Sequence, residues 1–208
     1  MATPDAWPMI HAERQALVTD LEAVTDEQWA TPSLCAGWSV RDVLAHLMAA
    51  ADQTPGGFVV RLAGSGFKFN KMVDKDIAKR TQGPPPSTLT AFKTRLNATT
   101  HPPGPIEAMV GEAVVHGEDI RRPLGISRTY PAETLIAVAD FYKKSNLLLG
   151  GKRRVTGLTL RATDIDWSTG AGPEVTGPAA SLVLGIAGRK AALDDLSGEG
   201  VAAFRTRF

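Results

Sequence analysis

The sequence predicts an α+β protein in which a helical bundle, residues 1–150, precedes a small α+β domain, residues 151–208. In the first part, apolar residues recur at helical spacing between connections rich in proline and glycine. From residue 155, apolar and polar residues alternate and several side chains are β-branched (VTGLTLRA), which is typical of a strand. The composition, 43% apolar and 22% charged over 208 residues, is that of an ordinary globular protein that needs no disulfide or metal merely to fold.

The clearest helix start in the first domain is Ser39, whose side chain can cap the backbone N–H of Asp42. Prolines and glycines bound the other helical patterns, and Ser87 or Thr88 is the expected cap of one of them. We expect helices over about residues 8–23, 40–52, 87–97, 105–123 and 131–149. Short links between them indicate a bundle of four main helices. Residues 53–83 receive no assignment, because paired glycines interrupt the pattern.

The second domain begins with the strand expected over residues 155–162. Residues 164–177 are rich in Asp, Thr, Gly and Pro, which is typical of turns or a hairpin. A helical apolar pattern resumes over residues 178–187 and closes at Gly188. The segment therefore supports one small sheet and a helix.

The charge balance excludes several classes of function. Lys and Arg number 23 against 22 Asp and Glu, so the whole chain has no field that attracts nucleic acid or an anionic membrane. No run approaches 18 apolar residues, and the first residues, MATPDAW, lack the pattern of a signal peptide. The single cysteine, Cys35, rules out a disulfide framework and suits a reducing compartment. We expect a soluble, cytoplasmic protein.

Two of the four histidines lie where a metal site can form. Glu112 and His116 are one helical turn apart, so both side chains lie on one face. His46 lies at a similar offset from the apolar stripe of its own helix, so packing of the two stripes can bring the three together. Two imidazoles and a carboxylate are the ligand pattern of catalytic zinc. Asp42 and Asp119 are spaced to orient the imidazoles.

Spacing leaves simpler interpretations open. A Glu-x-x-x-His pair also forms surface ion pairs, and His46 alone is also explained as a satisfied histidine at the edge of a core. Cys35 is either a nucleophile or, as lone cysteines usually are, a small buried hydrophobe. The basic stretch 68–80 either lines a cleft for an anion or forms a solvated face, which its interrupting aspartates favour.

Three longer segments carry a family resemblance. They are WATPSLCAGWSVRDVLAHL (residues 29–47), EAVVHGEDIRRPLG (residues 112–125) and GPAASLVLGIAGR (residues 177–189). In this order they resemble the signatures of the mycothiol-dependent maleylpyruvate isomerase family, within the wider DinB-like metalloprotein superfamily. The resemblance covers nearly the whole chain, and it is specific for the family but not for one activity.

The resemblance implies a DinB-like four-helix bundle with a small α+β C-terminal domain, and zinc ligands at His46, Glu112 and His116. It implies mycothiol, the low-molecular-weight thiol of actinobacteria, whose sulfur is expected to meet the metal. The family's C-terminal arginine falls on Arg189. That guanidinium can clamp a substrate carboxylate, or it can simply be a cation beside the dipole at a helix C-terminus.

The function that follows is a zinc- and mycothiol-dependent isomerase or S-transferase acting on a small electrophile. The metal would activate the thiol, and Arg189 would hold the substrate's carboxylates. The alternative is a non-catalytic DinB-like metal-binding protein with a stress or regulatory role. Another divalent metal would also accept these ligands. We expect a monomer or homodimer with small-molecule partners and with neither nucleic acid nor membrane; residues 53–83 have no assigned role.

Overall fold

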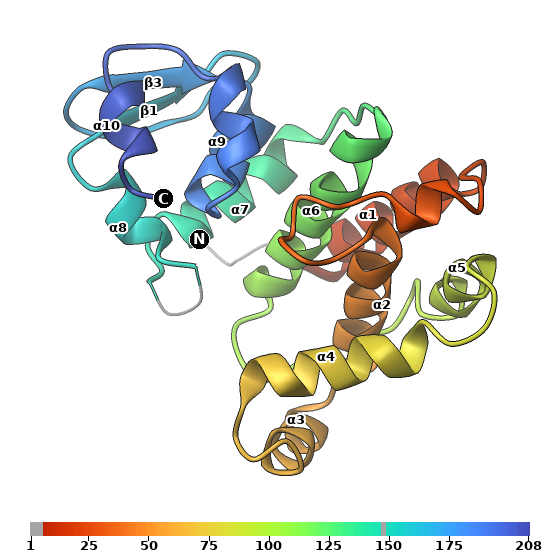
Figure 1. Cartoon of the computed structure of the whole chain (residues 1–208). Helices are drawn as coiled ribbons and strands as arrows, with labels where there is room; N and C mark the ends of the chain where they lie inside the picture. Colours follow the sequence, from red (N-terminus) through yellow and green to blue (C-terminus); the bar gives the residue numbers. More distant parts are fainter. Residues whose placement is uncertain (1–5, 147–148) are drawn as a thin grey trace. The chain divides into compact units, whose positions relative to one another are not determined.

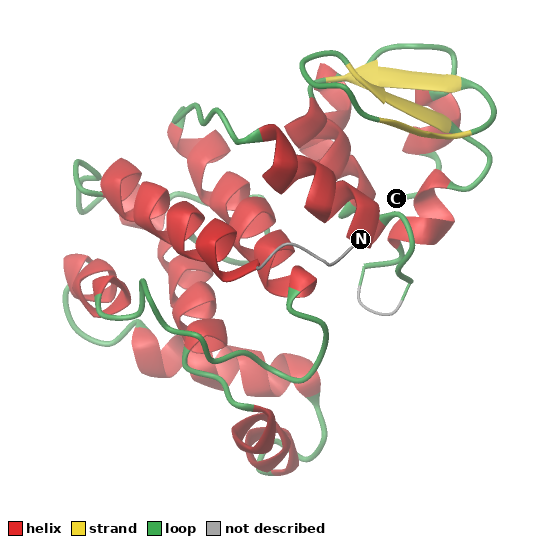
Figure 2. Cartoon of the chain, turned by 180° about the vertical axis from the view of Figure 1, so that it is seen from behind, coloured by secondary structure: helices red, strands yellow, loops and turns green. Residues whose placement is uncertain are grey.

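The protein is an α+β fold of two compact units, Met1–Arg128 and Thr129–Phe208, in a computed structural model that describes residues 6–146 and 149–208 (Figures 1 and 2). The division falls earlier than the boundary at residue 150 that the sequence indicated. The reason is that α7 (Ala132–Tyr142) packs against α9 (Ala179–Ile186) and so joins the second unit.

The regular elements of the first unit are helices, and its described residues add one isolated antiparallel bridge between Pro32 and Ser39. Its helices are α1 (Ala6–Leu21), α2 (Val40–Ala51), α3 (Pro55–Ala63), α4 (Phe69–Arg80), α5 (Pro86–Lys93) and α6 (Glu107–Arg121), with 3₁₀ turns at Gln28–Ala30 and Arg122–Leu124. The expected helix starts are met within two residues. The expected cap of α5 at Ser87 or Thr88 is wrong, because the helix begins at Pro86. Its fixed φ suits the first helical position, so Ser87 and Thr88 lie inside the helix rather than at its cap.

Four helices, α1, α2, α5 and α6, surround the main core of this unit (Figure 1). Both α5 and α6 pack against α1 and α2, and α4 packs against α2. Large apolar side chains fill the core, each worth about 1.5–3 kcal/mol when fully buried. They are Leu17, Val18, Leu21, Trp29, Val40, Val43, Leu44, Leu47, Met48, Leu89, Phe92 and Ile120. Packing of α2 on α6 is what positions the site described below.

The start of α2 is fixed by a capping box. Ser39 Oγ accepts from the backbone N–H of Asp42 at 3.2 Å, and the Asp42 carboxylate accepts from the N–H of Ser39 at 2.9 Å. Arg41 then ties α2 to α5 by donating to Thr88 Oγ1. It also ties α2 to the loop before α5 by donating to the carbonyls of Gln82, Gly83 and Pro84. The rotation of α2 about its axis is therefore constrained from its first turn.

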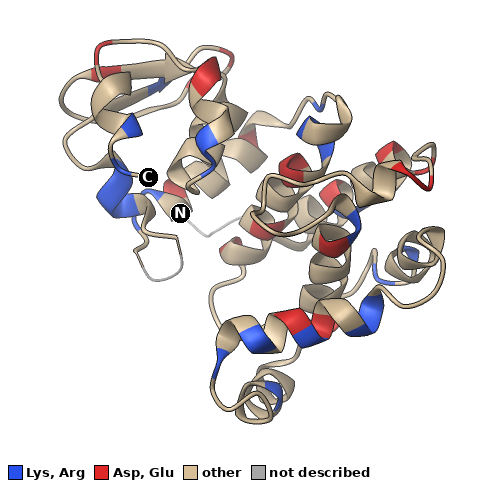
Figure 3. Ribbon diagram, in the orientation of Figure 1, with Lys and Arg blue, Asp and Glu red and all other residues tan. Residues whose placement is uncertain are grey.

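Residues 53–83, unassigned from the sequence, form α3 and α4. Thr54 caps α3 by accepting from the N–H of Gly57 at 3.1 Å, and Pro55 takes the first helical position. Basic and acidic residues alternate along α4 (Figure 3). Its lysines are exposed, which agrees with a solvated face, whereas Asp76 is partly buried and accepts from Arg61 and Arg80.

The second unit is built on a three-stranded sheet. Its elements are α7, α8 (Gly151–Val155), β1 (Thr159–Ala162), β2 (Ser168–Gly170), β3 (Glu174–Gly177), α9, a 3₁₀ turn (Lys190–Asp195) and α10 (Val201–Arg205). β1 is central, antiparallel to β2 and parallel to β3 (Figure 2). Gly170 has φ +89°, and a Cβ there would meet the Leu158 carbonyl oxygen at 2.1 Å, so this edge requires glycine. The expected helix over 178–187 is confirmed as α9.

Three expected elements are shorter than the sequence indicated. The helix expected over 87–97 ends at Lys93. The helix expected over 131–149 ends at Tyr142, after which Ser145 N–H donates to the Tyr142 carbonyl in a turn; residues 147–148 of that range lie outside the described residues. The strand expected over 155–162 begins at Thr159, because α8 extends to Val155 and Gly157 turns the chain at φ +73°. In the described parts of the chain, no helix combines the length and apolar character needed to span a membrane.

Replacing Ser39 by Ala should lower the free energy of unfolding by about 1 kcal/mol, because the first turn of α2 loses its side-chain acceptor. Urea denaturation measures this change. Thr90→Ala is the control, because Thr90 is exposed and its hydroxyl donates only within α5, to the Pro86 carbonyl; its effect should stay within about 0.5 kcal/mol. Equal effects of the two substitutions would contradict the cap.

Candidate metal centre

The three predicted ligands, His46, Glu112 and His116, come together at the contact between α2 and α6. His46 Nε2 lies 3.2 Å from Glu112 Oε2, and His116 Nε2 lies 3.3 Å from the same oxygen. The two imidazole rings are 4.8 Å apart between centroids, edge to face. Residues 66 positions apart in the chain thus converge on one carboxylate oxygen.

The packing of the two helices explains this convergence. Val43, Leu44 and Leu47 are buried in the bundle core, and His46 lies at the edge of that buried face. Glu112 and His116 occupy one face of α6 a turn apart. The side chains of His46 and His116 are 17% and 11% exposed and that of Glu112 is 32% exposed, so the site keeps a route to solvent.

One of the two predicted orienting aspartates has that role. His116 Nδ1 lies 2.9 Å from Asp119 Oδ2, and the Asp119 side chain is fully buried. A hydrogen bond at Nδ1 leaves Nε2 as the free nitrogen that faces Glu112. The sequence suggested that Asp42 orients His46, and this is wrong. The Asp42 carboxylate belongs to the capping box, where it accepts from the backbone N–H and the hydroxyl of Ser39.

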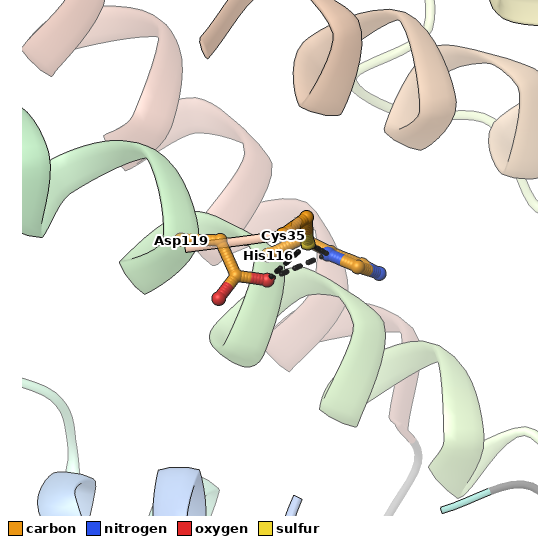
Figure 4. A group of neighbouring side chains, drawn as sticks. All are labelled: Cys35, His116 and Asp119. Carbon is orange, nitrogen blue, oxygen red and sulfur yellow. Dashed lines mark hydrogen bonds and ion pairs between the residues drawn. The ribbon is translucent and has the colours of Figure 1, made fainter. Parts of the chain in front are cut away.

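Sequence reasoning missed two neighbours of the site, Cys35 and Trp38, both on the loop before α2. The Trp38 ring lies 5.2 Å from the His46 ring. Cys35 Sγ donates to Asp119 Oδ2 at 3.0 Å and lies 3.6 Å from His116 Nδ1 (Figure 4). The expectation that Cys35 is merely a small buried hydrophobe is therefore incomplete. Their place in the WATPSLCAGWS segment, just before the histidine helix, was the available signal.

Charge attraction and hydrogen bonds together outweigh burial in setting the protonation of the cluster. Burial opposes the charged form of Glu112, but the neighbouring His116 and His46 hold the pKa of that carboxyl well below its usual range. Burial opposes the charged form of His116 as well, but Glu112 and the hydrogen bond to Asp119 raise its pKa well above that of a free histidine. Without a metal, the site therefore favours an imidazolium–carboxylate pair.

The donor set fits a tetrahedral divalent metal. Zinc–nitrogen and zinc–oxygen bonds of about 2.0–2.1 Å place neighbouring ligand atoms about 3.3–3.4 Å apart in a tetrahedron. The separations of 3.2 and 3.3 Å about Glu112 Oε2 match that spacing, and the three donor atoms lie within 4.8 Å of one another. Ligands of this type and number leave a coordination position for water or a thiol.

The other histidines lie elsewhere in the first unit. His11 Nε2 is 3.4 Å from the Ala98 carbonyl, and His101 Nδ1 is 2.7 Å from the Pro102 carbonyl.

A pocket of about 290 Å³, including solvent at its mouth, borders Glu112 within the bundle. Arg14 in its wall donates to the carbonyls of Arg95 and Ala98, and burial lowers the pKa of its guanidinium to about 10.

Arg189, the predicted carboxylate clamp, lies in the second unit directly after α9. Its backbone N–H donates to the Leu184 carbonyl at 2.9 Å, and its guanidinium donates to the Ala187 carbonyl at 3.2 Å. The pKa of Arg154 is lowered by burial first, then by the positive charge of Arg153 and then by that of Arg189, so the guanidiniums of Arg154 and Arg189 lie near each other. The side chain is partly exposed, as a ligand-binding arginine requires.

Residues 10–100 match the family model described as the mycothiol maleylpyruvate isomerase N-terminal domain. This part of the chain is therefore similar to the N-terminal domain of the mycothiol-dependent maleylpyruvate isomerases. The match supports the resemblance read from the sequence, and it includes the first of the three segments, residues 29–47. The family model covers the histidine of α2 but ends before α6, so Glu112 and His116 rest on the geometry above.

Solved structures show the same fold. A crystal structure of the mycothiol-dependent maleylpyruvate isomerase is similar at a TM-score of 0.64 and 17% identity, over 94% of this chain and 92% of that one. A crystal structure of a single-residue mutant of that enzyme is similar at a TM-score of 0.65 and 18% identity, with the same coverage. No curated protein sequence matches the chain significantly.

The electrostatics predict a bell-shaped stability for the metal-free protein. The lowered pKa of Glu112 contributes stability that is present above the ordinary glutamate pKa and is lost as pH falls through the lowered value. The raised pKa of His116 contributes stability that is present below the ordinary histidine pKa and is lost as pH rises through the raised value. The pair should stabilise the metal-free chain most between those two ordinary values.

Melting temperatures across pH in the presence of a chelator measure this effect. Glu112→Gln, which removes the charge but keeps the shape, should flatten the profile relative to the parent chain. Superimposable profiles for the two proteins would contradict the imidazolium–carboxylate pair.

Proposed function

We propose that this chain is a zinc- and mycothiol-dependent enzyme that adds the thiolate sulfur to a small, carboxylate-bearing electrophile. In an isomerase, the new C–S bond turns an activated double bond into a single bond, rotation follows, and expulsion of the same thiolate restores the double bond. In an S-transferase, the sulfur remains attached to the product. The match of residues 10–100 to the family model and the ligand cluster support the shared first step.

The observation that carries the proposal is the meeting of both Nε2 atoms with one Glu112 oxygen at the separation a tetrahedral metal requires. A surface ion pair would need only one of these contacts. The two histidines come from different helices and are both largely buried, which supports a metal-binding site rather than a surface ion pair.

A divalent metal held by His46, Glu112 and His116 would supply a Lewis acid that lowers the pKa of a thiol. The protein's own groups prepare this role. Asp119 accepts from His116 Nδ1 and so presents Nε2, while the Trp38 ring packs beside His46 and limits its rotation. The exposed part of Glu112 marks the side from which a thiol can approach.

We assign carboxylate binding to Arg189. Its planar guanidinium matches a carboxylate in a bidentate manner, and an anion would relieve the repulsion between Arg189 and Arg154. The two similar solved structures are of a mycothiol-dependent maleylpyruvate isomerase. We propose that this chain likewise uses a thiol and acts on a dicarboxylate.

Turnover of maleylpyruvate with mycothiol, followed by loss of the cis isomer, tests the proposal directly. The zinc-loaded chain should turn over substrate only with mycothiol present, and Glu112→Gln should reduce turnover by about a hundredfold or more, because a metal ligand is lost. Formation of a stable thioether in place of the trans isomer would identify a transferase. Zinc binding without thiol-dependent turnover of any electrophilic acid would favour the non-catalytic metal-binding alternative.

Replacing Arg189 by Lys should lower kcat/KM for a carboxylate substrate by about 10–100-fold, because a bidentate charge-assisted hydrogen bond becomes a single contact. Steady-state kinetics at constant zinc content measure it. Arg153→Lys is the matched control, because Arg153 is an exposed arginine of α8 and should leave kcat/KM unchanged. Equal kinetics for Arg189→Lys and the parent chain would remove Arg189 from substrate binding.

A further inference from the structure

The loop that carries Cys35 is folded tightly against α6. Ser33 N–H donates to the Trp38 carbonyl at 2.9 Å, Cys35 N–H donates to Ser33 Oγ at 3.1 Å, and Trp38 N–H donates to the Cys35 carbonyl at 3.0 Å. Gly37 closes the turn at φ +82°, a conformation that favours glycine. These bonds hold the Cys35 side chain in one direction.

A backbone hydrogen bond anchors the same loop to α6. Leu34 N–H donates to the Asp119 carbonyl at 3.2 Å, so the residue before Cys35 is bound to the residue that supports His116. The loop and α6 therefore keep their register around Asp119.

The thiol of Cys35 and the imidazole of His116 meet on one oxygen. Asp119 Oδ2 accepts from Cys35 Sγ at 3.0 Å and lies 2.9 Å from His116 Nδ1 (Figure 4). The Asp119 side chain is 0% exposed, so its carboxylate depends on protein donors for stabilisation. Two donors on one oxygen fix the carboxylate more firmly than one.

We propose that Cys35 is a positioning residue of the metal centre: its thiol holds the Asp119 carboxylate in the rotamer that accepts from His116 Nδ1, and so keeps Nε2 directed at the metal. The inference rests on the proposed metal site. It differs from a nucleophilic role because the thiol acts as a hydrogen-bond donor and is not consumed.

A rival use of the same atoms is direct ligation. Cys35 Sγ, His116 Nδ1 and Asp119 Oδ2 also lie within 4.8 Å of one another, the spacing of a metal-ligand group. Ligation through Nδ1 would break the 2.9 Å contact between His116 and Asp119 and would compete with the cluster formed by His46 and Glu112. The positioning role preserves every contact in both groups.

Zinc affinities of four full-length proteins test the proposal: the parent, Cys35→Ala, Asp119→Asn and the double variant. Competition against a chromophoric chelator gives each dissociation constant, and circular dichroism checks that each protein folds. Asp119→Asn should weaken zinc binding by roughly 10–100-fold and Cys35→Ala by roughly tenfold. In the Asp119→Asn background, Cys35→Ala should add no more than about twofold, because its effect passes through Asp119.

Cys35→Ser provides the conservative rescue, because its hydroxyl can also donate to Asp119; it should keep most of the parent affinity. The Co²⁺-loaded parent should show no sulfur-to-metal charge-transfer band in the near ultraviolet.

Each contrary result has a distinct meaning. A parent that binds zinc with an affinity equal to that of Cys35→Ala would overturn the positioning role and leave the metal site intact. A charge-transfer band that disappears in Cys35→Ser would make Cys35 a ligand instead. Failure of the parent to bind zinc or Co²⁺ would overturn both the proposed function and this inference.

Discussion

The contact of one Glu112 carboxylate oxygen with two imidazoles is the constraint on which the rest of the site depends. A partly buried carboxylate is stabilised by compensating charge or donors, and His46 and His116 supply both. Because the partners belong to α2 and α6, the contact requires these helices to pack in one register. The capping box at Ser39 and the buried face of α2 supply that register. Fold stability and ligand geometry are therefore set by the same contact between helices.

Support for the cluster extends outward in steps. His116 is oriented by Asp119, and Asp119 is held by Cys35 and by the backbone of Leu34. A second line runs through Trp38, whose ring packs beside His46. Both lines begin on the short loop before α2, so one segment steadies ligands on two helices. Preorganised ligands need little rearrangement on binding, which strengthens metal affinity.

Much of this architecture could be predicted from the sequence, and the exceptions have physical reasons. Helical spacing identified α2, α6 and the Glu112–His116 pair, because those signals are local. The approach of His46 to Glu112 and His116 depends on long-range packing between two helices. Sequence spacing therefore left a metal site as one of several interpretations. Thr54-Pro55 is a helix start whose signal was masked by the glycines that follow, so α3 was missed. Asp42 was misassigned because its carboxylate can either cap its own helix or accept from the imidazole one turn away. It accepts from the nearer backbone N–H of Ser39. The link from Cys35 to Asp119 joins residues 84 positions apart, beyond any periodicity.

The most direct test of the account is the metal content of the purified chain, measured by elemental mass spectrometry beside His46→Ala, His116→Ala and His101→Ala. The account predicts about one equivalent of a divalent metal in the parent and in His101→Ala, whose imidazole lies beside the Pro102 carbonyl and the Trp7 ring. It predicts almost none in the other two variants. All four proteins should remain folded, because the apolar core does not include these side chains. A parent that takes up no metal after reconstitution, or a His116→Ala variant that keeps full occupancy, would contradict the assignment of the cluster.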